Sequence, residues 1–143
     1  MPSSVGTATF MDKVAVVLWL MTALVGGYMF AHTLRHRESG SDAVASRMPT
    51  TIFFHPVGAI LGVTFLLIYA AGGPESTAWT AFGVLVATAA FGEYFFVRWL
   101  RDRRRLAEPR LIAEQQIPPL AVGLHGLLAT ATLVTTLVVA IQA

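Results

Sequence analysis

Four long apolar blocks constrain this chain more than any other feature of its sequence. They run over residues 14–34, 51–71, 78–100 and 118–141. A helix that crosses the hydrocarbon core of a bilayer needs roughly 20 apolar residues, whereas segments of about 10–14 predict buried core helices instead. The sequence therefore predicts an all-α membrane protein. We expect residues 1–143 to form one membrane domain, an antiparallel up-down-up-down bundle of four transmembrane helices.

The composition supports a membrane protein and excludes several classes of function. Hydrophobic residues make up 55% of the chain and charged residues 13%, whereas about a quarter of a soluble domain is charged. The chain has no cysteine, which excludes disulfides, thiolate metal sites, iron–sulfur ligation and covalent haem attachment. The phosphate-loop, dinucleotide, zinc-protease and nucleophile-elbow motifs are all absent. An electron-transfer or non-catalytic subunit is therefore favoured over a stand-alone enzyme.

The ends of the apolar blocks carry recognisable boundary signals. Residues 1–10 are small and polar, which predicts disorder, and Met11 is an alternative start. The first apolar run is about 20 residues and lacks an A-x-A site, so it is predicted to be an anchor and not a signal peptide, whose core has about 7–15 residues. Gly72-Gly73-Pro74 ends the second block and predicts a tight hairpin to the third.

Basic residues indicate the orientation. Nine of the ten lysines and arginines lie in or beside the loops at 35–50 and 101–117, and Lys13 is the exception. The positive-inside rule predicts that both loops are cytoplasmic and both termini lie outside. The strong preference for arginine indicates a bacterial source, hence the bacterial inner membrane. These loops are expected to bind anionic lipids and, because they adjoin membrane spans, not nucleic acid.

Each block contributes one ionisable residue to the predicted cytoplasmic half of the bundle. Such residues are expensive in lipid and invite a functional hypothesis. Glu93 and His125 lie about 9–11 Å from the inner ends of their blocks, so we expect them at matching depth and able to pair. His32 and His55 lie within about a turn of the inner interface, and His36 follows His32 by one helical turn.

Small residues surround these positions. Such residues either let the helices pack tightly or leave room for a flat cofactor, and Gly58 and Gly62 form a G-x-x-x-G pair that permits close helix approach. The first and second halves of the chain share only an outline of span, basic loop and span. No internal repeat with matching residues is evident, and a parallel duplication is left open as an alternative.

Three functions follow from this pattern. In the first, His125 with His55 or His32 ligates haem b, or a His or Glu93 is the hydrogen-bond partner of a quinone. An estimated depth difference of several ångströms between His55 and His125 counts against the haem pair. The second is an accessory or assembly subunit without a cofactor. The third is a small proton-coupled transporter using Glu93 and His125.

The hypothesis that we carry forward is a small subunit of a larger membrane complex acting in electron transfer. Its partners would be other membrane-protein subunits. The candidate cofactor-binding residues are His55, His125, His32 and Glu93, with His55 and His125 as candidate haem ligands.

Overall fold

Four long helices make up the protein. The computed structural model describes residues 4–38, 50–105 and 113–143, and these ranges contain helices and turns but no strand. The all-α class predicted from the sequence is therefore confirmed. Two short 3₁₀ segments, η1 and η3, precede the second and fourth long helices. The elements are α1 (Ser4–Glu38), η1 (Thr50–Phe53), α2 (Phe54–Ala70), α3 (Glu75–Arg105), η3 (Ala113–Gln116) and α4 (Pro119–Gln142).

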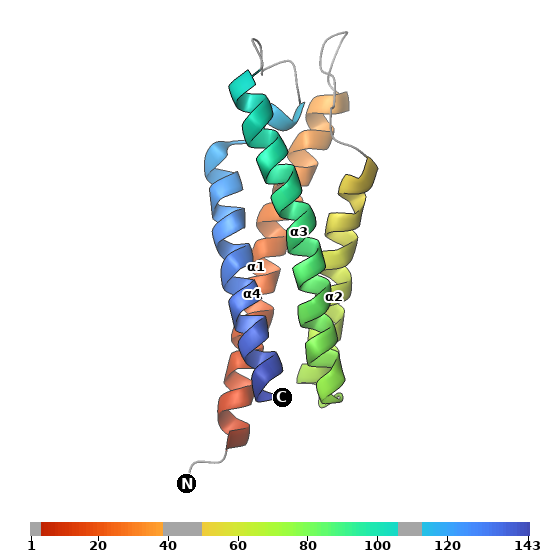
Figure 1. Cartoon of the computed structure of the whole chain (residues 1–143), viewed down its shortest axis with the longest axis vertical. Helices are drawn as coiled ribbons and strands as arrows, with labels where there is room; N and C mark the ends of the chain where they lie inside the picture. Colours follow the sequence, from red (N-terminus) through yellow and green to blue (C-terminus); the bar gives the residue numbers. More distant parts are fainter. Residues whose placement is uncertain (1–3, 39–49, 106–112) are drawn as a thin grey trace.

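The helices run alternately up and down one bundle (Figure 1). The start of α1, the end of α4 and the turn between α2 and α3 lie at one end of the bundle, and the C-terminal ends of α1 and α3 lie at the other. The largest interfaces are those between α2 and α3 and between α1 and α4. The interfaces between α1 and α2 and between α3 and α4 are smaller. It follows that α1 lies diagonally opposite α3, and α2 diagonally opposite α4.

The helix boundaries differ from the predicted blocks in two places. The chain is already helical from Ser4, so the expectation of disorder through residue 10 is wrong for residues 4–10. The predicted hairpin is confirmed: α2 ends at Ala70, and Gly72 adopts a left-handed φ of 92° before α3 begins at Glu75. Backbone bonds from Ala71 N to Leu67 O (3.0 Å) and from Gly73 N to Ile68 O (2.9 Å) close the end of α2.

Three of the helices are long and apolar enough to cross a membrane. They are the segments Phe10–Arg35, Glu75–Arg105 and Pro119–Gln142, while α2, with 17 residues, is shorter. Large apolar side chains also cover the outside of the bundle: Leu120 is 83% exposed and Leu24 is 75% exposed. Such a surface is compatible with hydrocarbon and unfavourable in water.

The core is concentrated in the half of the bundle that holds the chain ends. Trp19 is only 2% exposed and packs with Ala15, Leu66 and Leu85. Gly62 faces the Trp19 ring, and a Cβ at this position would overlap it. Gly58 similarly faces the hydroxyl of Thr88 on α3. The glycine pair therefore allows the close approach predicted from the sequence, each glycine toward a different helix.

Two hydrogen bonds, one in each direction, join the C-terminal end of α3 to η3. The indole Nε1 of Trp99 donates to the carbonyl of Glu114 at 3.0 Å, and the amide Nε2 of Gln115 donates to the carbonyl of Trp99 at 3.0 Å. The Arg103 guanidinium lies 5.2 Å from the Trp99 ring centroid, within the range of a cation–π contact. These contacts fix the direction from which the chain enters α4.

The two halves of the chain carry identical residues at matching positions, which the sequence analysis did not identify. Residues of α1 match residues of α3 that lie 66 positions later. Nine pairs are identical: Ala15/Ala81, Thr22/Thr88, Ala23/Ala89, Gly26/Gly92, Tyr28/Tyr94, Phe30/Phe96, Leu34/Leu100, Arg35/Arg101 and Arg37/Arg103. Between α2 and α4 the spacing is 70, and the identical pairs are His55/His125, Ala59/Ala129, Leu67/Leu137 and Ala70/Ala140.

Buried residues of the first half also match buried residues of the second half. The matched pairs in which both members are buried are Asp12/Ala78, Ala15/Ala81, Trp19/Leu85, Thr33/Trp99, Gly62/Thr132 and Leu66/Thr136. The large α2–α3 interface corresponds in the same way to the large α4–α1 interface. The bundle is thus built from two similar helical hairpins related by an approximate two-fold axis, which supports the parallel duplication that the sequence analysis left open.

Candidate functional site

Two histidines meet between the diagonal helices α2 and α4. The ring centroids of His55 and His125 are 6.1 Å apart, and the ring planes are inclined at 65°. Both side chains are half-buried. The sequence placed the two residues at different depths because it counted from Thr51 and Pro118 with one uniform helical rise. From Thr50 the 3₁₀ segment η1 rises about 6 Å to Phe53 at about 2.0 Å per residue, and two α-helical steps to His55 add about 3 Å. From Pro119 to His125 the α-helix also rises about 9 Å.

Each imidazole is anchored to the backbone of a helix in the other half of the chain. The Nδ1 of His55 lies 2.9 Å from the carbonyl oxygen of Thr88 on α3, and the Nδ1 of His125 lies 3.1 Å from that of Thr22 on α1. Because a carbonyl can only accept, Nδ1 is the donor in both cases. In a neutral imidazole the lone pair then resides on Nε2. Both rings therefore have the tautomer in which Nε2 is able to bind a metal or accept a proton.

Two glycines make these anchors possible. Gly26 and Gly92 follow Thr22 and Thr88 by four residues, and a helical carbonyl points toward the residue four positions ahead. A Cβ at Gly26 would lie 2.9 Å from Cε1 of His125, and one at Gly92 would lie 2.9 Å from Cε1 of His55. Any larger side chain would thus separate the imidazole from the carbonyl to which it donates.

The threonine hydroxyls occupy equivalent positions as well. Thr22 Oγ1 donates to the carbonyl of Leu18 and Thr88 Oγ1 donates to that of Val84, each at 2.8 Å. Thr22 Oγ1 also lies 3.0 Å from Thr132 Oγ1, which links α1 to α4. These local bonds satisfy the hydroxyls within apolar surroundings. The carbonyls of Thr22 and Thr88 are left as the acceptors for the histidines.

The sequence carried a signal for this arrangement that was not recognised. A T-A-x-x-G segment occurs at residues 22–26 and again at 88–92, and an H-x-x-x-A segment occurs at 55–59 and again at 125–129. Each T-A-x-x-G segment receives the histidine of an H-x-x-x-A segment from the opposite half. Comparing the chain with itself would have identified both pairs.

Glu93 does not join the histidines. Consecutive helical residues are rotated by about 100° around the axis, so Gly92 faces His55 while the side chain of Glu93 is exposed. His125 contacts Thr22, Gly26 and His55. The predicted Glu93–His125 pair is therefore not formed.

His32 lies apart from the histidine pair along α1. It follows Gly26 by six residues, which is about 9 Å along the axis, and its ring packs beside Tyr28 with centroids 5.8 Å apart. The predicted association of His32 with His36 falls on a side chain outside the described residues. Of the four predicted site residues, the structure brings together His55 and His125.

The histidine pair is not part of a larger ligand cluster. Within residues 4–38, 50–105 and 113–143, no group of three or more His, Asp or Glu side chains is arranged to hold a metal ion. Protein-only sites for zinc ions use three or four protein ligands. Comparison with protein-family models, with curated proteins and with solved structures finds no match to this chain.

Proposed function

We propose that this protein is a membrane electron-transfer subunit in which His55 and His125 ligate one haem b from opposite sides. The observation that carries the proposal is the meeting of two anchored imidazoles from diagonal helices, with ring centroids 6.1 Å apart. Four-helix bundles hold cofactors between side chains of facing helices, and imidazole is a common axial ligand of haem iron.

The number of ligands favours haem over a bare metal ion. Haem supplies its own ring of nitrogen ligands, so two imidazoles complete the coordination of its iron. A bare ion would need further protein ligands, and the described part of the chain offers no cluster that provides them. The absence of cysteine is compatible with a haem that is not covalently attached.

The spacing and the hydrogen bonds of the rings also support haem. Metal–imidazole bonds are about 2.0–2.1 Å long, so two nitrogens that share one metal lie about 4 Å apart. Two imidazoles whose Nε2 atoms shared one metal would have ring centroids somewhat farther apart than those nitrogens, and the centroids of His55 and His125 are 6.1 Å apart. Histidine ligands usually donate the other ring N–H to a carbonyl or carboxylate, as both Nδ1 atoms do in this site.

We further propose that all four helices cross the membrane, with both termini outside. Although α2 has 17 residues, η1 continues it by four more, which supports a complete crossing of roughly 30 Å. The basic ends of α1 and α3 lie at the end of the bundle opposite the chain termini (Figure 1). The positive-inside rule assigns that end to the cytoplasm of a bacterium, where it would contact anionic lipids.

The exposed carboxylate of Glu93 supports membership of a larger complex. A charged group facing lipid within a membrane span is costly, and contact with a polar group of another membrane subunit would remove that cost. The same exposure weakens the transporter hypothesis, which required Glu93 to pair with His125. An accessory subunit without a cofactor would not need two imidazoles anchored in equivalent ways.

Purification in mild detergent tests the proposal. We expect a reduced-minus-oxidised spectrum of the b type, together with copurifying membrane subunits identified by mass spectrometry. His32→Ala is the matched control because His32 lies outside the pair, and it should keep the spectrum. A well-folded protein without a haem spectrum, whether expressed alone or with its partners, would refute the haem assignment.

A further inference from the structure

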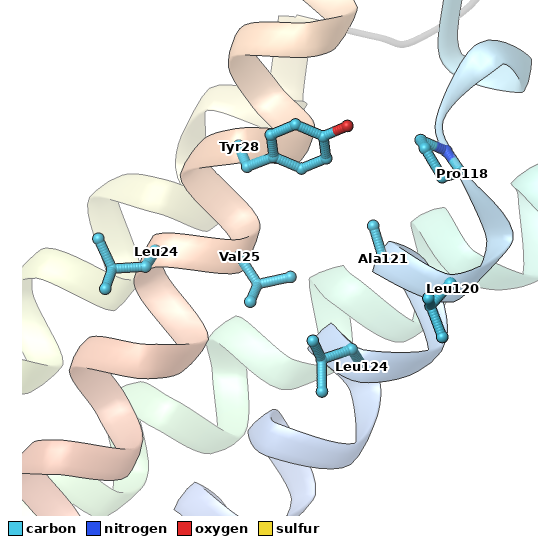
Figure 2. Close-up of a pocket in the computed structure, with 7 residues that line it drawn as sticks. All are labelled: Leu24, Val25, Tyr28, Pro118, Leu120, Ala121 and Leu124. Carbon is cyan, nitrogen blue, oxygen red and sulfur yellow. The ribbon is translucent and has the colours of Figure 1, made fainter.

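A groove opens between α1 and α4 near the histidine pair. Its volume is about 440 Å³, within the range of about 300–1,000 Å³ that small-molecule sites occupy. Figure 2 shows α1 and α4 as its two walls. The lining residues are Leu24, Val25, Tyr28, Pro118, Leu120, Ala121 and Leu124.

One polar side chain lines this apolar groove. The phenol of Tyr28 extends from α1 across the groove, and its hydroxyl points toward the α4 side near Pro118 (Figure 2). Tyr28 is half-exposed, and the His32 ring packs beside it. An apolar groove with a single hydrogen-bonding group at one end suits a ligand with a flat apolar body and a carbonyl oxygen.

The groove is a direct neighbour of the histidine pair. Val25 on its α1 wall precedes Gly26, which contacts His125, and Leu124 on its α4 wall precedes His125 itself. The groove thus lies at the level of the histidine pair along both helices, on a neighbouring face of each. Leu24 and Leu120 in the lining are 75% and 83% exposed, so a long apolar tail would extend from the groove into lipid.

We infer that this groove binds the head group of a membrane quinone, with the Tyr28 hydroxyl donating a hydrogen bond to a quinone carbonyl. The hydrocarbon part of a lipid would fill the same apolar walls but offers no acceptor to the hydroxyl. The inference rests on the proposed function for its role in electron transfer. Binding itself does not require a haem.

The approximate two-fold relation provides matched variants. The equivalent of Tyr28 on α3 is Tyr94, and the equivalents of Val25 and Leu124 are Phe91 and Phe54. Val25→Phe therefore introduces into the groove a residue that the chain already carries at the corresponding position. Tyr28→Phe keeps the ring and removes only the hydroxyl, and Tyr94→Phe is its control.

The test is photolabelling of the purified full chain in detergent with a short-tailed azidoquinone, followed by peptide mapping. We expect label on residues 24–28 and 118–124, displaced by decylubiquinone but not by decylbenzene, which keeps a ring and tail without carbonyls. Tyr28→Phe should weaken displacement by decylubiquinone about five- to tenfold, the worth of one hydrogen bond. Val25→Phe should abolish the label, and Tyr94→Phe should leave it unchanged.

Two results would overturn the inference. Displacement by decylbenzene as effective as by decylubiquinone would mean that the groove holds only an acyl chain. Label spread evenly over the outer faces of all helices would mean that the probe merely partitions into the micelle. Specific labelling of a protein without a haem spectrum would instead refute the proposed haem and leave the quinone site standing.

Discussion

The imidazole rings of His55 and His125 lie with their centroids 6.1 Å apart, although the residues are 70 positions apart in sequence. Each ring donates to a backbone carbonyl in the opposite hairpin, His55 to Thr88 and His125 to Thr22. Neither hairpin alone contains both a histidine and its acceptor. The site is therefore completed only when the two halves of the bundle assemble.

Replacing Gly26 or Gly92 with alanine should disrupt the site. The added Cβ would lie 2.9 Å from Cε1 of the facing histidine, and overpacking of this kind costs about 1–3 kcal/mol. We expect each variant to lower the free energy of unfolding by that amount and to lower haem content. Thermal unfolding in detergent and the haem-to-protein ratio measure the two effects.

Gly27→Ala and Gly83→Ala are the matched controls, because no atom lies within 4 Å of a Cβ built at either position. Alanine is favoured over glycine in a helix interior by about 0.5–1 kcal/mol. These variants should be neutral or stabilising. Equal destabilisation by Gly26→Ala and Gly27→Ala would contradict the close contact with His125.

The hydroxyls of Thr22 and Thr132, 3.0 Å apart, should couple α1 to α4. A double-mutant cycle with Thr22→Val and Thr132→Val should give a coupling energy of about 0.6 kcal/mol, with about 1.7 as an upper bound for such pairs in membranes. The control cycle pairs Thr22→Val with Thr130→Val, since the exposed Thr130 bonds only the Gly126 carbonyl of its own helix. A control coupling as large as the first would refute a direct Thr22–Thr132 bond.

Trp99→Phe should loosen the junction between α3 and η3. The change removes the indole donor from the carbonyl of Glu114, which keeps only the longer bond of 3.4 Å from the Ile117 N–H. The net loss of one hydrogen bond costs about 0.5–1.5 kcal/mol. Gln115, which is 8% exposed, donates back to Trp99, so Gln115→Ala should have an effect in the same direction. Trp79→Phe, at an exposed position of α3, should change the unfolding temperature little.

Single cysteines in the cysteine-free chain test the four crossings. A membrane-impermeant thiol reagent should label Arg35→Cys and Arg104→Cys only from the cytoplasmic side, and Ser76→Cys and Ala143→Cys only from the outside. Arg35 and Ser76 are separated by one long helix, α2. Labelling of both from one side of the membrane would mean that α2 does not cross.

Several parts of the fold were predictable because they depend on composition. Apolar length identified the helices, and Gly72-Gly73-Pro74 identified the hairpin, whose left-handed residue is Gly72. The start of α1 was placed too late because small polar residues before Phe10 read as disorder, although serine, threonine and alanine are compatible with a helix. Asp12, which is buried within α1, lies before the predicted block at residues 14–34 and was not among the candidate residues.

The site was only partly predictable because it depends on rotation and on local helix type. Counting residues cannot show that Gly92 faces inward and Glu93 outward, since neighbouring residues differ by about 100°. It also cannot show that η1 brings His55 to the depth of His125. The internal repeat was overlooked because its identical residues are scattered along the helices instead of forming a continuous block.

Haem content per chain in paired histidine variants tests the central claim most directly. We expect one haem per chain in the native protein, loss of the bound haem in both His55→Ala and His125→Ala, and native content in His32→Ala, with all variants folded by circular dichroism. Haem retained with an unchanged spectrum in both His55→Ala and His125→Ala would contradict the account, because no axial ligand would then come from the pair.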